Sequence, residues 1–146
     1  MNTSYQDSPS FGFWLIAGIG LVWNAFGMVT FAQTIGMSPS AFRLLPEAEQ
    51  ALIAATPGWV TIVYGVAVFA GSIGCLLLMF KTAWSVAVLG ISLLAVLVQM
   101  GHGIFYTNLL EVRGQSAVFL PTAIIVVAIF LFWYANKAKS QGFFAK

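Results

Sequence analysis

Four long apolar stretches without a charged residue limit what this chain can fold into more than any other feature of its sequence. They cover about residues 11–32, 58–80, 83–105 and 117–135. A helix needs about 20 apolar residues to cross the hydrocarbon layer of a bilayer, and a helix satisfies its own backbone polar groups there. The sequence therefore predicts an all-α fold, a bundle of four transmembrane helices that forms a single membrane domain over residues 1–146.

The scarcity of charge excludes most classes of soluble protein. The chain has 6 Lys and Arg and 4 Asp and Glu, all outside the four stretches, while 60% of its residues are hydrophobic. So few charges exclude a disordered chain and a nucleic-acid-binding surface. The single Cys75 can form neither an internal disulfide nor a multi-thiolate metal site. We expect the lipid bilayer to be the main partner and expect no nucleic acid.

The distribution of basic residues predicts the orientation of the bundle. The leading decapeptide MNTSYQDSPS has no basic residue and the first apolar stretch is too long for a signal-peptide core, so this stretch is expected to remain as a span. Four crossings place both termini on one side. Basic residues on that side are Lys81, Lys137, Lys139 and Lys146, against Arg43 and Arg113 on the other. The positive-inside rule then predicts cytoplasmic termini, with a cytoplasmic tail over residues 136–146.

The first outer connection contains a segment with helical signals, LPEAEQALIAATP. Its apolar residues recur at helical spacing, at Leu45, Ala48, Leu52 and Ala55. Its acidic residues, Glu47 and Glu49, come early, and a proline lies near each end, at Pro46 and Pro57. We expect a short amphipathic helix on the outer surface, with Pro46 in its first turn. It would serve either as a plug of the bundle or as a lid. In the second outer connection, Glu111 and Arg113 are expected to form a solvated turn at Gly114 rather than to pair with each other.

Small and polar residues predict which helix faces meet one another. In the third span, Ser85, Ser92, Gln99 and Tyr106 are seven residues apart, with Ala95 and His102 between them. Small residues also share one face of each of the first two spans, and such residues let helices approach closely. They are Ala17, Gly20 and Gly27, beside Asn24 and Phe31, in the first span, and Ala67, Gly71, Gly74 and Cys75, beside Tyr64, in the second. The fourth span is almost wholly apolar, so it is expected to meet lipid or another subunit.

The polar groups within the spans are the candidates for a binding site. At a rise of about 1.5 Å per residue, most of them fall in the outer half of the membrane. The candidate substrate-binding residues are Trp23, Asn24, Tyr64, Gln99 and His102. Such side chains also form hydrogen bonds between helices, so a purely structural role for these residues stays open. No carboxylate lies within a span, and no catalytic, metal-binding or cofactor-binding motif occurs, so we expect a protein that is not an enzyme and carries no cofactor.

Several short motifs resemble a group of small bacterial four-helix membrane proteins that often carry the provisional label of sugar transporter. They are WNAFG at Trp23–Gly27, PGW at Pro57–Trp59, GSIGCLLL at Gly71–Leu78, Trp84 after the short basic link, and Gln99. The resemblance covers most of the first three spans and implies a location in the bacterial inner membrane. Members of the group often have an acid and a tyrosine soon after the WN pair. This chain has Thr30 and Phe31 there, which disfavours a charged substrate.

Two functions from different classes remain open at this stage. The first is transporter-like handling of a small neutral solute, such as a sugar, by an oligomer, since an aromatic ring can stack on a sugar face while amides exchange hydrogen bonds with hydroxyls. The alternative is a non-catalytic accessory or assembly subunit of a larger membrane complex. A redox enzyme that binds a quinone has the least support, because only Tyr64 and His102 could take part in proton chemistry.

Overall fold

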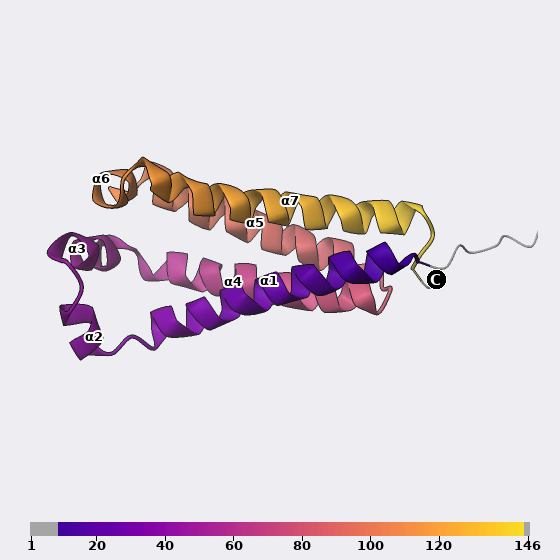
Figure 1. The fold of residues 1–146 in the computed structure, drawn as a ribbon, viewed down its shortest axis with the longest axis horizontal. Helices are drawn as coiled ribbons and strands as arrows, with labels where there is room; N and C mark the ends of the chain where they lie inside the picture. The colour runs from indigo at the N-terminus through magenta and orange to yellow at the C-terminus, as the bar shows by residue number, and fades with distance from the viewer. Residues whose placement is uncertain (1–8, 145–146) are drawn as a thin grey trace, which may run out of the picture.

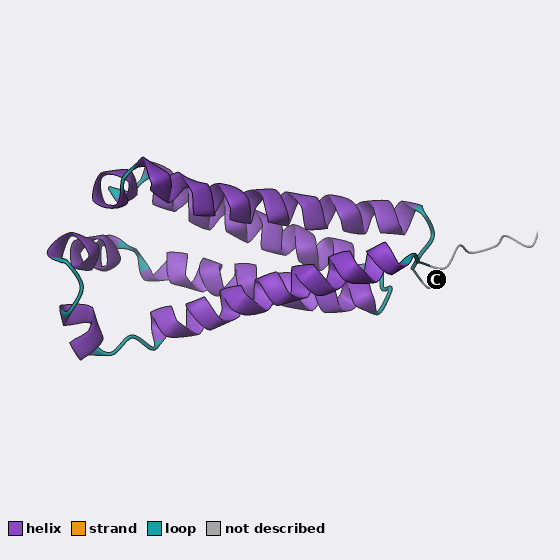
Figure 2. Ribbon diagram, in the orientation of Figure 1, coloured by secondary structure: helices purple, strands orange, loops and turns teal. Residues whose placement is uncertain are grey.

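Helices account for nearly all of the chain in a computed structural model of the protein, which describes residues 9–144 and contains no strand in that range (Figure 2). The four long helices are α1 (Phe11–Ile35), α4 (Gly58–Met79), α5 (Trp84–Phe105) and α7 (Phe119–Ser140). Each is long and apolar enough to cross a membrane. They extend side by side along the longest axis of the molecule (Figure 1). The predicted all-α bundle of four apolar helices is therefore confirmed, while Asp7 and Lys146 lie outside the described residues.

The short helices gather at one end of the bundle, which we call the loop end (Figure 1). Between α1 and α4 lie α2 (Pro39–Arg43) and α3 (Glu47–Ala55), and between α5 and α7 lie α6 (Leu109–Arg113) and η1 (Gln115–Val118). The opposite end, the terminal end, holds the start of α1, the end of α7 and the tight turn between α4 and α5. Lys81 makes this turn with a φ of 55°, in the left-handed region.

The first connection contains the expected amphipathic helix, α3, and a further short helix that the sequence analysis missed. This further helix is α2, where the Ser38 hydroxyl accepts a hydrogen bond from the Ala41 N–H at 3.2 Å and Pro39 takes the first helical position. Ser-Pro is a typical helix start, but a helix of 5 residues gives no periodicity to detect. Pro46 lies at the N-cap of α3, one residue before the expected position in its first turn.

Small residues allow the long helices to pack closely, as expected from the sequence. The pairs in extensive contact are α1 with α4, α4 with α5, and α5 with α7. A Cβ added at Gly74 of α4 would lie 2.6 Å from Leu89 Cγ of α5, and one added at Gly20 of α1 would lie 2.7 Å from Leu131 Cδ2 of α7. Larger side chains at these glycines would therefore require the neighbouring leucine side chains or the helices themselves to shift.

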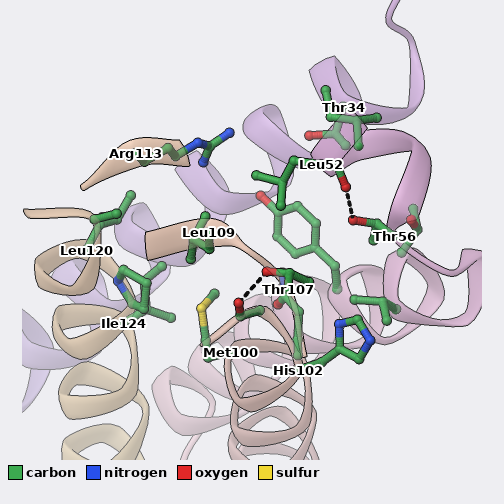
Figure 3. A pocket seen from close by; sticks show the side chains of 18 of the residues that line it. Thr34, Leu52, Thr56, Met100, His102, Thr107, Leu109, Arg113, Leu120 and Ile124 are labelled. Atoms are coloured by element: carbon green, nitrogen blue, oxygen red, sulfur yellow. Dashed lines mark hydrogen bonds between the residues drawn. The ribbon is translucent and has the colours of Figure 1, made fainter. Parts of the chain in front are cut away.

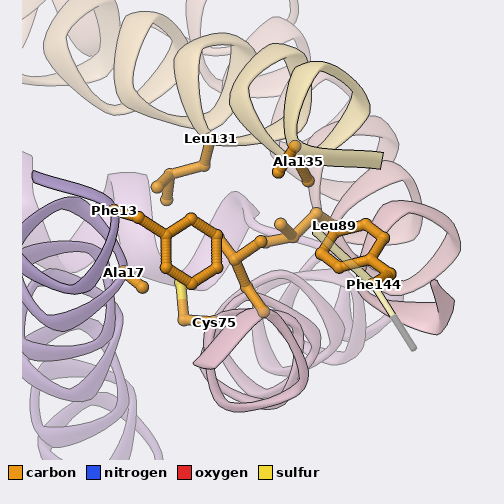
Figure 4. Close-up of a cluster of buried hydrophobic side chains, with 9 residues drawn as sticks. Phe13, Ala17, Cys75, Leu89, Leu131, Ala135 and Phe144 are labelled. Carbon is orange, nitrogen blue, oxygen red and sulfur yellow. The ribbon is translucent and has the colours of Figure 1, made fainter. Parts of the chain in front are cut away.

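Buried apolar side chains fill the bundle at its terminal end (Figure 4). We call this set the terminal core; its buried members are Phe13, Ala17, Cys75, Leu78, Leu89, Leu131, Ala135, Ala138 and Phe144. They come from all four long helices and from the chain after α7. Figure 4 shows Phe13 of α1 between Leu131 of α7 and Cys75 of α4. This layer leaves the terminal end of the bundle closed.

The last part of the chain belongs to this core rather than to a free tail. Helix α7 continues past residue 135 to Ser140, and Gly142 then turns the chain with a φ of 74°. The turn is a Schellman-type helix end, in which the Phe143 N–H donates to the Ala138 carbonyl at 3.1 Å. Phe144 then returns into the terminal core with 7% of its surface exposed. The expected tail over residues 136–146 is thus helical at first, and its residues 145–146 lie outside the described range.

Candidate functional site at the loop end

A pocket of about 550 Å³ lies within the loop-end half of the bundle. Its walls come from α4, α5 and α7, with Thr34 from the end of α1, and α3 and α6 cover it at the loop end (Figure 3). Pockets of this size hold ligands of a few tens of heavy atoms or fewer. The side chains that can form hydrogen bonds in its wall are Thr34, Thr56, Thr61, Tyr64, Gln99, His102, Thr107, Arg113 and Ser116.

Three of the five predicted site residues meet in this pocket. Tyr64 comes from α4, while Gln99 and His102 come from α5, one helical turn apart. The two α5 residues lie on the stripe that the spacing of polar residues predicted, and all three side chains are partly buried. Within the described part of the chain, the Gln99 amide has no hydrogen-bond partner, so both its donor and its acceptor remain free for a ligand.

The Tyr64 hydroxyl is held by α1 through a short chain of hydrogen bonds. Its oxygen lies 2.7 Å from Thr30 Oγ1, and Thr30 Oγ1 donates to the Gly27 carbonyl at 2.9 Å. The Tyr64 hydroxyl also lies 3.4 Å from the Gly27 carbonyl, so its single proton is donated either to Thr30 or to Gly27. The phenol oxygen of Tyr64 therefore offers the pocket only an acceptor.

His102 lies between two aromatic rings at the edge of the pocket. Its ring centroid is 5.2 Å from that of Trp59 in an edge-to-face arrangement and 5.7 Å from that of Tyr106 in a stacked one. The imidazole has no hydrogen-bond partner in the part of the chain that is described. Aromatic contacts on both sides thus set the orientation of the His102 ring and leave its two nitrogens free.

An ion pair joins the two loop-end connections across the mouth of the pocket. Arg113 of α6 donates from Nε to Glu49 Oε1 at 2.8 Å and from Nη2 to Glu49 Oε2 at 2.7 Å. As expected, Arg113 does not pair with Glu111, but the expectation that Arg113 is solvated without a partner was wrong, because it pairs with Glu49 of α3, 64 positions away in the chain. Gly114 does make the expected turn, with a φ of 77°. The hydrogen bond from Arg113 is the main reason that the pKa of Glu49 is lowered; burial opposes it, and the charge of Arg113 adds a smaller lowering effect.

The other two predicted site residues lie away from the pocket. Trp23 and Asn24 of α1 line a separate cavity of about 30 Å³, near the middle of the bundle. Asn24 Nδ2 donates to the Gly20 carbonyl at 2.8 Å, and the amide packs against Gly71 of α4. Trp23 is 39% exposed on the outside of α1. Neither residue contacts the larger pocket, so the structure divides the five candidates between two cavities.

The two serines of the α5 stripe, Ser85 and Ser92, are buried within the bundle and do not line the loop-end pocket. Ser92 is buried and donates to the Ala67 carbonyl of α4 at 2.7 Å, which links the two helices. Ser85 is fully buried near the terminal end, and its hydroxyl has no partner among the described residues. The stripe therefore changes role along α5, from helix contact at the terminal end to pocket wall at the loop end. Tyr106, its last member, is 82% exposed.

Sequence reasoning missed several residues that line the pocket, notably Thr34, Thr56, Thr107 and Arg113. All four lie at the ends of spans or in connections, where a polar residue is ordinary and gives no periodic signal. The three threonine hydroxyls each donate to the carbonyl four residues earlier, which is a common local arrangement in helices. Their position in one wall depends on how α1, α3 and α5 come together, which no spacing in the sequence shows.

No group of three or more His, Cys, Asp or Glu residues is placed to bind a metal ion within residues 9–144. A scan against protein-family models and searches of curated proteins and of solved structures find no match to this chain. The resemblance to the small four-helix group therefore stays a prediction from the motifs, and the function has to be argued from the pocket itself.

Proposed function

We propose that this protein is a multi-pass protein of the bacterial inner membrane that binds a small uncharged solute in the loop-end pocket and takes part in its transport. The observation that carries this proposal is the charge state of the pocket wall. Among the lining residues, only Arg113 carries a permanent charge, and Glu49 neutralises it through two hydrogen bonds. A charged ligand would lack a counter-ion in this wall, whereas a neutral ligand with hydroxyl groups finds Gln99 and Tyr64 as partners.

The difference between the two ends of the bundle supports a transport role over a purely structural one. The pocket reaches the loop end, and the terminal core closes the other end. A solute could thus enter from one side only, as in one of the two states of an alternating-access cycle. With cytoplasmic termini, as the basic residues predict, the pocket opens toward the outside. We propose an oligomer because α1 and α7 bury little of their surface within one chain and leave it free for a second copy.

Uptake into proteoliposomes tests this proposal. We expect vesicles that contain the protein to take up at least one radiolabelled neutral sugar faster than protein-free vesicles do. Gln99→Leu should lower that uptake by about fivefold, the loss expected for one neutral hydrogen bond. Gln141→Leu is the matched control, because Gln141 is exposed at the terminal end and should leave uptake unchanged.

Two results would contradict the proposal. One is a rate equal to that of protein-free vesicles for every neutral solute tested, with no binding to the purified protein. The other is recovery of the protein from its native membrane only in a fixed complex with a different membrane protein, measured by native mass spectrometry, which would favour the accessory role.

A further inference from the structure

The wall of the loop-end pocket is mostly apolar, which is unusual for a site that would hold a free sugar. Its apolar side chains come from several different helices and include Leu52 of α3, Val60 of α4, Met100 of α5, and Leu120 and Ile124 of α7. Met100 and Ile124 also pack on a small buried cluster around Ala67, Ala95 and Val96. A ligand made only of hydroxyl groups would leave much of this surface without a suitable partner.

Four hydroxyl groups of the wall favour a ligand that donates hydrogen bonds. The hydroxyls of Thr34 and Thr56 each donate to a carbonyl of their own segment at 2.9 Å, and that of Thr107 donates in the same way to Gly103. The proton of the Tyr64 hydroxyl is donated to Thr30 or to the Gly27 carbonyl. These four oxygens therefore face the pocket as acceptors, while the Gln99 amide can both donate and accept. An alcohol group has the matching donor and acceptor on one atom.

Between α4 and α7, which both line the pocket, the bundle has a lateral opening, because these two helices make no extensive contact with each other. Helix α7 packs on α5, and neither α1 nor α4 makes extensive contact with it. Helix α1 crosses α4 and reaches α7 only in the terminal half, so its loop-end half lies on the far side of α4 from α7 (Figure 1). Leu120 of α7 lies at the edge of this opening, since it lines the pocket and yet has 64% of its surface exposed. A molecule dissolved in the bilayer can thus reach the pocket without leaving the lipid.

We propose that the ligand of this pocket is an uncharged amphiphile, with a hydroxyl-bearing head and an apolar chain, that enters from the loop-side leaflet between α4 and α7. This inference rests on the proposed function of the pocket and adds the class of ligand and its route. The head lies between Gln99 and Tyr64, and the chain lies along Met100, Leu120 and Ile124 and leads out to the lipid. The Arg113–Glu49 pair covers the aqueous side and keeps this end of the pocket neutral.

Photolabelling with an alkyl glucoside tests the ligand class. The protein is extracted in a zwitterionic detergent free of sugar, placed in phosphatidylcholine nanodiscs and irradiated with octyl glucoside that carries a diazirine on its chain. We expect peptide mass spectrometry to find the label on residues of the pocket wall, with displacement by unlabelled octyl glucoside and little displacement by glucose. Gln99→Leu should lower the labelling by about fivefold, as for one lost neutral hydrogen bond, whereas Gln141→Leu should not.

A second pair of variants tests the route. Leu120→Trp places a bulky ring at the opening and should abolish the labelling of the pocket wall. Val126→Trp places the same ring on the exposed face of α7, away from the pocket, and should leave the labelling unchanged. Both positions are more than half exposed, so neither substitution should prevent folding.

The possible outcomes separate this inference from the function on which it rests. Displacement of the label by glucose as effective as by octyl glucoside, or equal labelling of the Leu120→Trp and Val126→Trp proteins, would overturn the inference and leave a pocket for a soluble neutral solute. Labelling spread evenly over the lipid-facing residues, unaffected by Gln99→Leu and accompanied by no sugar uptake, would overturn both.

Discussion

Individual glycines set how closely the helices of this protein approach. Gly71 of α4 is the clearest case, because the side-chain amide of Asn24 occupies the space where a Cβ would lie. Asn24 in turn satisfies its own donor on the Gly20 carbonyl, so a polar side chain is accommodated between two apolar helices. The WNAFG and GSIGCLLL motifs thus meet each other in the structure. Their shared role here is helix packing, and Asn24 does not reach the loop-end pocket.

Gly71→Ala should therefore destabilise the protein. The new methyl group would overlap the Asn24 amide, and overpacking of this kind costs about 1–3 kcal/mol. We expect the protein in detergent to reach half-unfolding at a lower temperature, as measured by circular dichroism. Gly18→Ala is the control, because a Cβ at Gly18 of α1 would meet nothing within 4 Å. Its unfolding temperature should stay the same or rise slightly, and an equal loss in both variants would contradict this account of Gly71.

At the scale of elements, the two short helices α3 and α6 form a cover over the pocket. The Arg113–Glu49 pair is the polar link between them, and Leu52 and Leu109 line the pocket from the same two helices. The side chain of Arg113 is 50% exposed, so the pair is open to screening by salt and contributes little to overall stability. Its effect is local, because it links two short helices, α3 and α6, to each other.

Acid should separate α3 from α6. The pKa of Glu49 lies below its ordinary value of 4.5 because Arg113 donates a hydrogen bond to the carboxylate. A carboxyl group whose pKa is lowered in the folded protein contributes its full stabilisation when the pH is above its ordinary pKa. This stabilisation is lost as the pH falls through the lowered pKa of the folded protein. With nitroxide labels at Ala51→Cys and Leu110→Cys, we expect electron paramagnetic resonance to give a narrow distance distribution at neutral pH and a broad one well below pH 4.5.

Variants of the two nearby acidic residues provide the control for this experiment. Glu49→Gln should broaden the distance distribution at every pH, because an amide cannot form the charged pair. Glu47→Gln changes an exposed residue of the same helix, which has no ionic partner among residues 9–144, and should match the parent protein. A distribution that is insensitive both to acid and to Glu49→Gln would show that apolar contacts alone hold the cover.

The whole molecule is asymmetric from one end to the other. The terminal end is filled by a core to which all four long helices and Phe144 contribute, and the loop end has a pocket below two short helices. Apolar packing is dense where the side chains are large and the helices converge, and it is interrupted where α7 and α1 diverge (Figure 1). The proposed direction of access follows from this asymmetry once the orientation in the membrane is known.

Cysteine labelling in intact bacteria measures this orientation. We expect Ala54→Cys in α3 to react with a membrane-impermeant maleimide, and Lys139→Cys in α7 to react only after the cells are permeabilised, because the positive-inside rule places the lysines in the cytoplasm. The natural Cys75 is fully buried and should give no background. The reverse pattern would contradict the orientation, and labelling of both positions in intact cells would contradict the two-sided arrangement.

The sequence by itself determined the number of long helices and the presence of α3. It also determined which faces carry small residues. These features depend on local quantities, namely the length of an apolar stretch and a period of about 3.6 residues, and each can be counted along the chain. For the same reason the sequence placed Gln99 and His102 on one face of α5.

Only the tertiary structure decided which of these polar residues share a cavity. The crossing of α1 over α4 carries Asn24 to Gly71 and away from Gln99, although both had been expected in the same pocket. Glu49 and Arg113 are separated by 64 positions and pair only because α3 and α6 fold over the same opening. Helix crossing and the paths of the connections arise from packing among many residues, so no spacing in the chain encodes these two contacts.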